Sequence, residues 1–153
     1  MQKKIFLLVA ILFLSSCGYK AIYSKKIITN HEFYISKINF IGDRKINLKI
    51  KEKLNNYTIN KKNKNFILNI TSTSEKIVLV KNSSGSATDY QKRISLNVEV
   101  LIDDKSNNSF MVVESFNYKN TPNKFNLKRY EKEINNNLAE TAADKLIFKL
   151  SNI

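Results

Sequence analysis

Apolar and polar residues alternate along several segments of the chain, and a period of two residues predicts strands with one buried face. The pattern is most regular in residues 94–102, ISLNVEVLI, where every second residue is apolar. Residues 33–41, FYISKINFI, show a similar alternation. Its expected inner side consists of Tyr34, Ser36, Ile38 and Phe40. Residues 66–81 predict one long strand or two short ones with a polar interruption at 72–75, and residues 110–118 predict a further strand.

Two other segments repeat their apolar residues every three or four positions, which predicts helices with one apolar stripe. Asp43 is a candidate N-cap for the first helix, and Asn126 for the second. The first stripe is formed by Ile46, Ile50, Leu54 and Tyr57. The second runs through the last 27 residues and comprises Tyr130, Ile134, Leu138, Ala142, Leu146 and Leu150, widened by Ala139, Ala143 and Ile147.

These segments predict one α+β domain over residues 33–153, with the order β-α-β-β-β-α. A turn is expected around Gly85, and the sequence DDKSNN at residues 103–108 predicts a second turn. Strands joined by short turns pair antiparallel. We therefore expect a four-stranded, largely antiparallel sheet with both helices packed on one face.

The first 16 residues are typical of an export signal peptide. Lys3 and Lys4 precede ten apolar residues, 5–14, and the small residues Ser15 and Ser16 follow. As a helix, ten residues would be about 15 Å long, against a bilayer hydrocarbon core of about 30 Å. The apolar run is therefore too short to span a membrane.

Residues 14–17, LSSC, resemble the bacterial lipobox and end at Cys17, the single cysteine of the chain. In proteins with that motif the thiol receives a diacylglycerol, the chain is cut before the cysteine, and the new amine is acylated with a fatty acid such as palmitate. This predicts a lipoprotein anchored through Cys17, with residues 17–32 as a tether. Gly18 is not the aspartate that favours inner-membrane retention, which points to the outer membrane. The alternative is an ordinary signal peptide and a mature chain with an unmodified thiol.

A formal net charge of +13 favours anionic partners. For an exported protein these are lipid phosphates, lipopolysaccharide or peptidoglycan, and we expect no nucleic-acid partner. His31 is the single histidine and falls in the tether, so Cys/His metal sites and His-based catalytic sets cannot be assembled. Asp103 and Asp104 are adjacent in the turn sequence and do not converge as catalytic acids must. We expect no enzyme activity, no cofactor and no metal.

Several of these segments together resemble LptE, the lipopolysaccharide-assembly lipoprotein family of the outer membrane. The similar stretches are CGYKAIY at 17–23, GSATDYQKRISLNVEVLIDD at 85–104 and LAETAADKLIFKL at 138–150. The resemblance implies a non-enzymatic plug and assembly aid inside the β-barrel of LptD, which contacts lipopolysaccharide on its way to the outer leaflet. It also implies a location at the periplasmic side of the outer membrane.

Basic residues beside turns or helix starts are the candidates for contacts with lipopolysaccharide phosphates. They are Lys81, Lys92, Arg93, Lys128 and Arg129. The competing interpretation is a solvated lysine surface without a ligand. Two other functions stay open: a periplasmic adaptor that binds peptidoglycan or activates an envelope enzyme, and a lipid carrier, which would need an apolar cavity.

Overall fold

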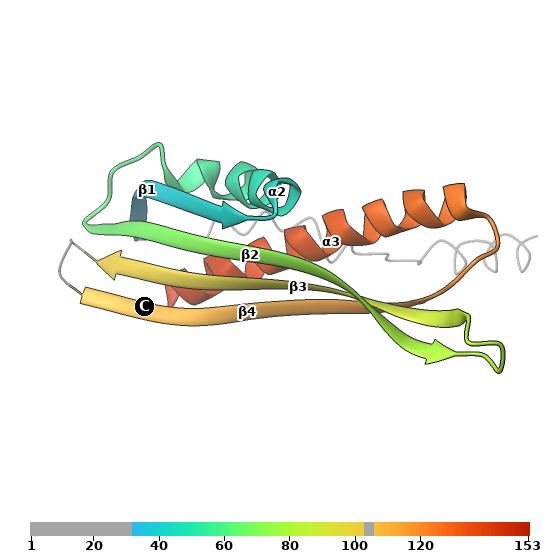
Figure 1. Cartoon of the computed structure of the whole chain (residues 1–153). Coiled ribbons are helices and arrows are strands. Elements are labelled where there is room, and N and C mark those ends of the chain that lie inside the picture. The colour runs from blue at the N-terminus through green and yellow to red at the C-terminus, as the bar shows by residue number, and fades with distance from the viewer. Residues whose placement is uncertain (1–31, 103–105) are drawn as a thin grey trace, which may run out of the picture. The chain divides into compact units, whose positions relative to one another are not determined.

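The structure is a computed structural model that describes residues 32–102 and 106–153 (Figure 1). Within these residues the chain forms four strands and two α-helices in the predicted order β-α-β-β-β-α. The elements are β1 (Phe33–Gly42), α2 (Arg44–Leu54), β2 (Lys64–Lys81), β3 (Ala87–Ile102), β4 (Ser106–Lys119) and α3 (Lys124–Ser151), with a short 3-10 turn, η2 (Asn55–Tyr57), after α2. The predicted α+β class is confirmed.

The sheet has the strand order β1-β2-β3-β4. β2, β3 and β4 form an antiparallel meander, whereas β1 runs parallel to β2. Parallel neighbours need a crossover connection, and α2 provides it. β1 pairs with β2 only up to Gly42 and Ser72, so the rest of β2 continues past β1 with β3 as its neighbour. The largely antiparallel sheet is confirmed.

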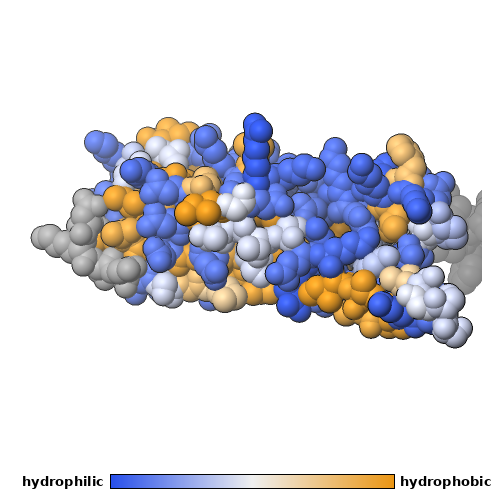
Figure 2. Space-filling model, viewed as in Figure 1, coloured by the Kyte–Doolittle hydropathy of each residue, from blue (hydrophilic) through white to orange (hydrophobic). Residues whose placement is uncertain are grey.

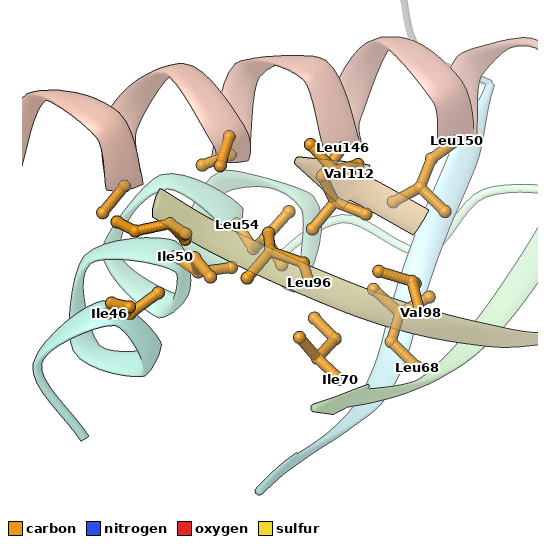
Figure 3. Close-up of a cluster of buried hydrophobic side chains, with 14 of the residues drawn as sticks. Ile46, Ile50, Leu54, Leu68, Ile70, Leu96, Val98, Val112, Leu146 and Leu150 are labelled. Atoms are coloured by element: carbon orange, nitrogen blue, oxygen red, sulfur yellow. The ribbon is translucent and has the colours of Figure 1, made fainter. Parts of the chain in front are cut away.

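Both helices cover the same face of the sheet (Figure 1). α2 lies against β1 and β2, and α3 lies against β3, β4 and α2. The predicted stripes face inward: Ile46, Ile50 and Leu54 of α2 are fully buried. They meet the buried side of the meander in one continuous core (Figure 3), which includes Leu68, Ile70, Leu96, Val98, Val112, Leu146 and Leu150.

The expected inner side of β1 is wrong over its first half. Phe33 and Ile35 are buried, and Tyr34 is on the other side. The register with β2 shifts between Ile35 and Lys37, so one extra residue sits in the strand. Such a bulge reverses the alternation, and after it Ile38 packs against the core as predicted.

The predicted starts of α3 and β4 differ from the structure, whereas the predicted start of α2 does not. Asp43 caps α2 as expected, because its carboxylate accepts the backbone N–H of Lys45 and Ile46. The cap of α3 is Asn123, which accepts the N–H of the expected cap, Asn126. β4 begins at Ser106 and takes in part of the predicted turn. Asp103 and Asp104 lie outside the described residues.

The polar interruption at 72–75 does not break β2, because its serines are satisfied by the helices. Ser72 is buried and donates a 2.7 Å hydrogen bond to Oδ1 of Asn47 in α2. Ser74 donates a 3.0 Å bond to Oδ1 of Asn135 in α3. Gly42, the last residue of β1, lies against the backbone of Ser72. Its φ is 98°, and an added Cβ would lie 1.9 Å from the carbonyl oxygen of Ser72. Only glycine fits there.

Candidate lipid-phosphate site

A groove of about 560 Å³ lies between α2, the first half of α3 and the sheet. We call it the basic groove. α2 and its cap contribute Asp43, Lys45, Leu48, Lys49 and Glu52, the sheet contributes Ser74 and Lys92, and α3 contributes Lys128, Glu131, Lys132, Asn135 and Asn136. The groove therefore joins residues that are about 90 positions apart in the chain.

The carboxylates of the basic groove are already engaged. Asp43 accepts the N–H groups that begin α2. Glu52 lies 3.2 Å from Nζ of Lys49, and Glu131 lies 2.6 Å from Nζ of Lys76. In contrast, Lys92, Lys128 and Lys132 form no ion pair within the described part of the chain. The groove consequently offers ammonium groups to an anion.

Glu131 is the centre of a hydrogen-bond network at the floor of the groove. Besides Lys76, it accepts a 2.8 Å hydrogen bond from the hydroxyl of Tyr118. Burial alone would raise the pKa of Glu131. The hydrogen bonds from Lys76 and Tyr118 and the charges of Lys76 and Lys92 outweigh burial and hold its pKa below the ordinary value. Burial and the bond to Glu131 raise the pKa of Tyr118. Glu131 is therefore a fixed anion that orders the groove.

An aromatic cluster supports this network from the sheet side. The rings of Tyr90 and Tyr118 are 5.6 Å apart, and Tyr130 of α3 meets Tyr118 edge-on at 6.1 Å. Nζ of Lys76 lies 3.8 Å above the Tyr90 ring, a favourable cation–π distance. Tyr130, an expected core residue, is 43% exposed, because it packs at the margin of the sheet.

Exposed apolar side chains also occur on the part of β2 that extends past β1, where Val78 is on the same side of the sheet as Lys76 and Lys92. Val78, Leu79 and Val80 are each exposed by 44% or more. Figure 2 shows the apolar patch, in orange, along the β2–β3 hairpin near its tip. α3 begins at the same end of the sheet (Figure 1), and its Phe125 is 75% exposed. Apolar and cationic groups are thus combined at this end.

The structure brings together two of the five predicted phosphate contacts. Lys92 and Lys128 both line the basic groove. Arg93 does not, because neighbouring residues of a strand point to opposite faces. Its side chain is on the face that no helix covers, where it donates a 3.0 Å hydrogen bond to Oε1 of Gln91. Lys81 is exposed at the end of β2, and Arg129 is exposed on α3 outside the groove.

Three further lysines of the groove were absent from the predicted set. Lys132 follows Lys128 by one helical turn, and this spacing of four could have indicated a shared face. Lys45 and Lys49 also differ by four, on α2. Their meeting with α3 depends on helix packing across the sheet, which a single sequence does not reveal.

Residues 32–102 and 106–153 contain no group of three side chains that could hold a metal ion, and none of their helices is long and apolar enough to cross a membrane. Cys17, the predicted lipidation site, and His31 lie outside that part. The predicted signal peptide and nearly all of the tether also lie outside it.

Comparison with known proteins gives a fold likeness. No family model matches the sequence, and no curated protein matches it. Rare lipoprotein B from Shewanella oneidensis superposes with a TM-score of 0.61 at 14% identity, over 76% of this chain and 94% of that chain. Uncharacterized lipoprotein B from Nitrosomonas europaea superposes with a TM-score of 0.59 at 12% sequence identity, over 79% of this chain and 86% of that chain. A minor lipoprotein from Acinetobacter baumannii superposes with a TM-score of 0.54 at 12% sequence identity, over 76% of this chain and 91% of that chain. The chain is similar in fold to these bacterial lipoproteins.

Proposed function

We propose that this protein is a lipid-anchored, non-enzymatic component of lipopolysaccharide transport at the outer membrane, of the LptE kind. The observation that carries the proposal is the agreement of two independent features. The domain is similar in fold to bacterial lipoproteins along three quarters of the chain, and the sequence LSSC before the domain resembles a lipobox ending at Cys17. The anchor would hold the domain at the periplasmic side of the membrane.

The basic groove suits the phosphates of lipopolysaccharide. Ammonium groups form short, charge-assisted hydrogen bonds to phosphate oxygens, and Lys92, Lys128 and Lys132 form no salt bridge with a carboxylate of the described residues. The exposed side chain of Val78, which follows Lys76 on the same side of β2, would contact the acyl chains of the same molecule. Phosphates and acyl chains next to each other are the chemistry of an anionic glycolipid.

The open face of the sheet suits a barrel partner such as LptD. Ser95, Asn97 and Glu99 point away from the helices, and Glu99 accepts a 3.4 Å hydrogen bond from Asn69. A barrel lumen is polar and water-lined, so the polar part of this face, on β2 and β3, can occupy it without a loss of hydrogen bonds. On this proposal the domain acts as a plug and needs neither a cofactor nor a catalytic group.

Affinity purification of the full chain from membranes tests the partner. We expect an outer-membrane β-barrel to co-purify, together with lipopolysaccharide. Isolation alone, or with a peptidoglycan synthase or transglycosylase, would contradict the proposal and favour the periplasmic adaptor.

Two matched double variants test the groove. Lys92→Glu with Lys128→Glu reverses two charges inside it, and Lys81→Glu with Arg93→Glu reverses two charges outside it. We expect the first pair to weaken lipopolysaccharide binding by about tenfold or more, since hydrogen bonds to charged groups contribute roughly 1.5–3 kcal/mol each. The second pair should have a much smaller effect at low salt, where surface charges act most strongly. Equal losses would mean that only net charge matters.

A further inference from the structure

The outer edge of β4 is the least protected edge of the sheet. β4 is the terminal strand of the sheet order, and its register with β3 runs without a shift from Ser106 to Lys119. Among the described residues, no strand pairs with its other side (Figure 1). An exposed edge presents unpaired N–H and C=O groups that can pair with another chain.

The usual protective devices do not occur along this edge. Residues 106–118 contain no proline, and the bulge that interrupts the other edge strand, β1, between Ile35 and Lys37 has no counterpart in β4. Glu114 is the one charged residue in that stretch, and Lys145 of α3 holds its carboxylate in a salt bridge. Charges, prolines and bulges normally discourage edge pairing, so β4 is built to accept a strand.

The backbone groups that point outward can be assigned. The N–H of Asn120 donates a 2.7 Å hydrogen bond to the carbonyl of Thr88, directly beyond the last β3–β4 pair. In an antiparallel ladder, successive residues direct their groups to alternate sides. Even-numbered residues of β4 therefore bond to β3, and odd-numbered residues such as Met111 and Val113 direct their N–H and C=O outward.

Exposed apolar side chains on β4 have polar neighbours on β3. Met111 is 57% exposed and Val113 is 46% exposed; they lie opposite Asn97 and Ser95. Phe116 is 46% exposed and lies opposite Lys92. A strand added at the open edge would supply apolar neighbours for these side chains.

Two phenylalanines of β4 are placed symmetrically about Val113. Phe110 and Phe116 are each three positions from it. If a second β4 pairs antiparallel with Val113 opposite its own copy, Phe110 comes to lie opposite Phe116 twice, and Met111 is diagonal to Val113 of the other copy. Even-numbered residues then form non-hydrogen-bonded pairs, whose side chains lie closest together, and aromatic pairs there are favourable.

We propose that the β4 edge is a self-association surface, through which a second copy of this chain extends the sheet across a two-fold axis at Val113. Antiparallel pairing of two β4 strands about this axis brings the same surface of both copies together, as an isologous interface requires. On this proposal the free protein forms the dimer. A partner that binds a single copy must first separate the two copies. The inference is independent of the proposed lipopolysaccharide role.

A charge placed on the axis tests the proposal. In the full chain, solubilised in detergent, we expect sedimentation equilibrium to show a monomer–dimer equilibrium. Val113→Lys should leave monomer only, because two lysines would lie directly opposite each other. The matched control is Ile41→Lys on the other edge strand, where Ile41 is 67% exposed; it should dimerise like the original chain.

A mixing experiment tests the register. Val113→Lys and Val113→Glu should each be monomeric, and an equal mixture should form a heterodimer, because lysine then lies opposite glutamate. A chain that is monomeric at every concentration would overturn the proposal, as would a dimer that survives Val113→Lys or a mixture that stays monomeric. Slow amide exchange at Val113 in the monomer would also overturn it, because another segment of the same chain would then occupy the edge.

Discussion

Tyr118 donates a 2.8 Å hydrogen bond to Glu131, and this bond ties the end of β4 to the first third of α3. Glu131 receives a second bond, of 2.6 Å, from Lys76 of β2. One carboxylate thus holds the helix to two strands that are not neighbours in the sheet. Its pKa is held below the ordinary value by these partners, against the opposing effect of burial.

The stability of the domain should depend on the charge of Glu131. Because the folded state lowers its pKa, this contribution is fully present above the ordinary pKa of 4.5 and is lost as the pH falls below that value toward the folded pKa. We expect Glu131→Gln to reduce the free energy of unfolding at pH 7 and to flatten its decline on acidification. Urea unfolding at several pH values measures both effects.

Glu133→Gln is the matched control for that experiment. Glu133 is exposed on the same helix and forms no ion pair in the described part of the chain. A pH profile of Glu131→Gln that parallels the profile of Glu133→Gln would show that the network does not stabilise the fold.

The inner side of α3 should carry much of the stability. Leu146 is completely buried, whereas Phe148, two residues later, is 69% exposed. We expect Leu146→Ala to lower the free energy of unfolding by about 2–5 kcal/mol and Phe148→Ala to change it little. Ala142 is also completely buried, so Ala142→Leu should cost about 1–3 kcal/mol through overpacking. Thermal unfolding compares the three variants, and equal values for Leu146→Ala and Phe148→Ala would contradict the packing.

Two glycines with similar backbone angles should respond differently to alanine. Gly42 and Gly85 have φ values of 98° and 81°, and a Cβ would meet the Ser72 backbone at Gly42 but nothing within 4 Å at Gly85. Gly85→Ala should lower the free energy of unfolding by only about 1–2 kcal/mol, because alanine must adopt the left-handed backbone conformation but meets no steric clash. Gly42→Ala should cost clearly more, because the β1–α2 junction must move. Denaturant unfolding of both variants is the measurement, and a larger loss at Gly85 would be inconsistent with the close approach.

Cys17 lies outside the described residues, and its acylation is a prediction from the sequence LSSC. Mass spectrometry of the mature protein should find an N-terminal cysteine that carries acyl groups. Cys17→Ala should release the protein from membranes while its thermal unfolding stays unchanged. Cleavage at another position, or an unmodified thiol, would refute lipidation.

Regular alternation allowed the sheet to be predicted where one face is buried without interruption. Ile94 to Val100 in β3 are buried at every second position, as the sequence indicated. The bulge after Ile35 was not predictable, because its cause is the pairing with β2 and not the composition of β1. The parallel direction of β1 likewise depends on how α2 packs.

The candidate site was predicted less completely than the fold. Lys92 and Lys128 meet in the basic groove, yet Arg93 lies on the opposite face although it is adjacent to Lys92 in the chain. The candidate phosphate contacts are basic residues close to turns or helix starts. Closeness to a turn does not indicate the face of the sheet to which a strand residue points. Glu131 was not selected at all, because its role depends on Lys76 and Tyr118, which come from two different strands.

The late position of α3 in the chain has a consequence for the timing of folding. Its residues Leu138, Ala142 and Leu146 complete the core, but they follow the entire sheet in the sequence. At roughly 5–20 residues per second of synthesis, the sheet waits a few seconds for its cover. During that interval the core is incomplete, which favours the unfolded state that a translocation channel can thread. For a protein proposed to be exported, a core that closes last keeps the chain competent for secretion.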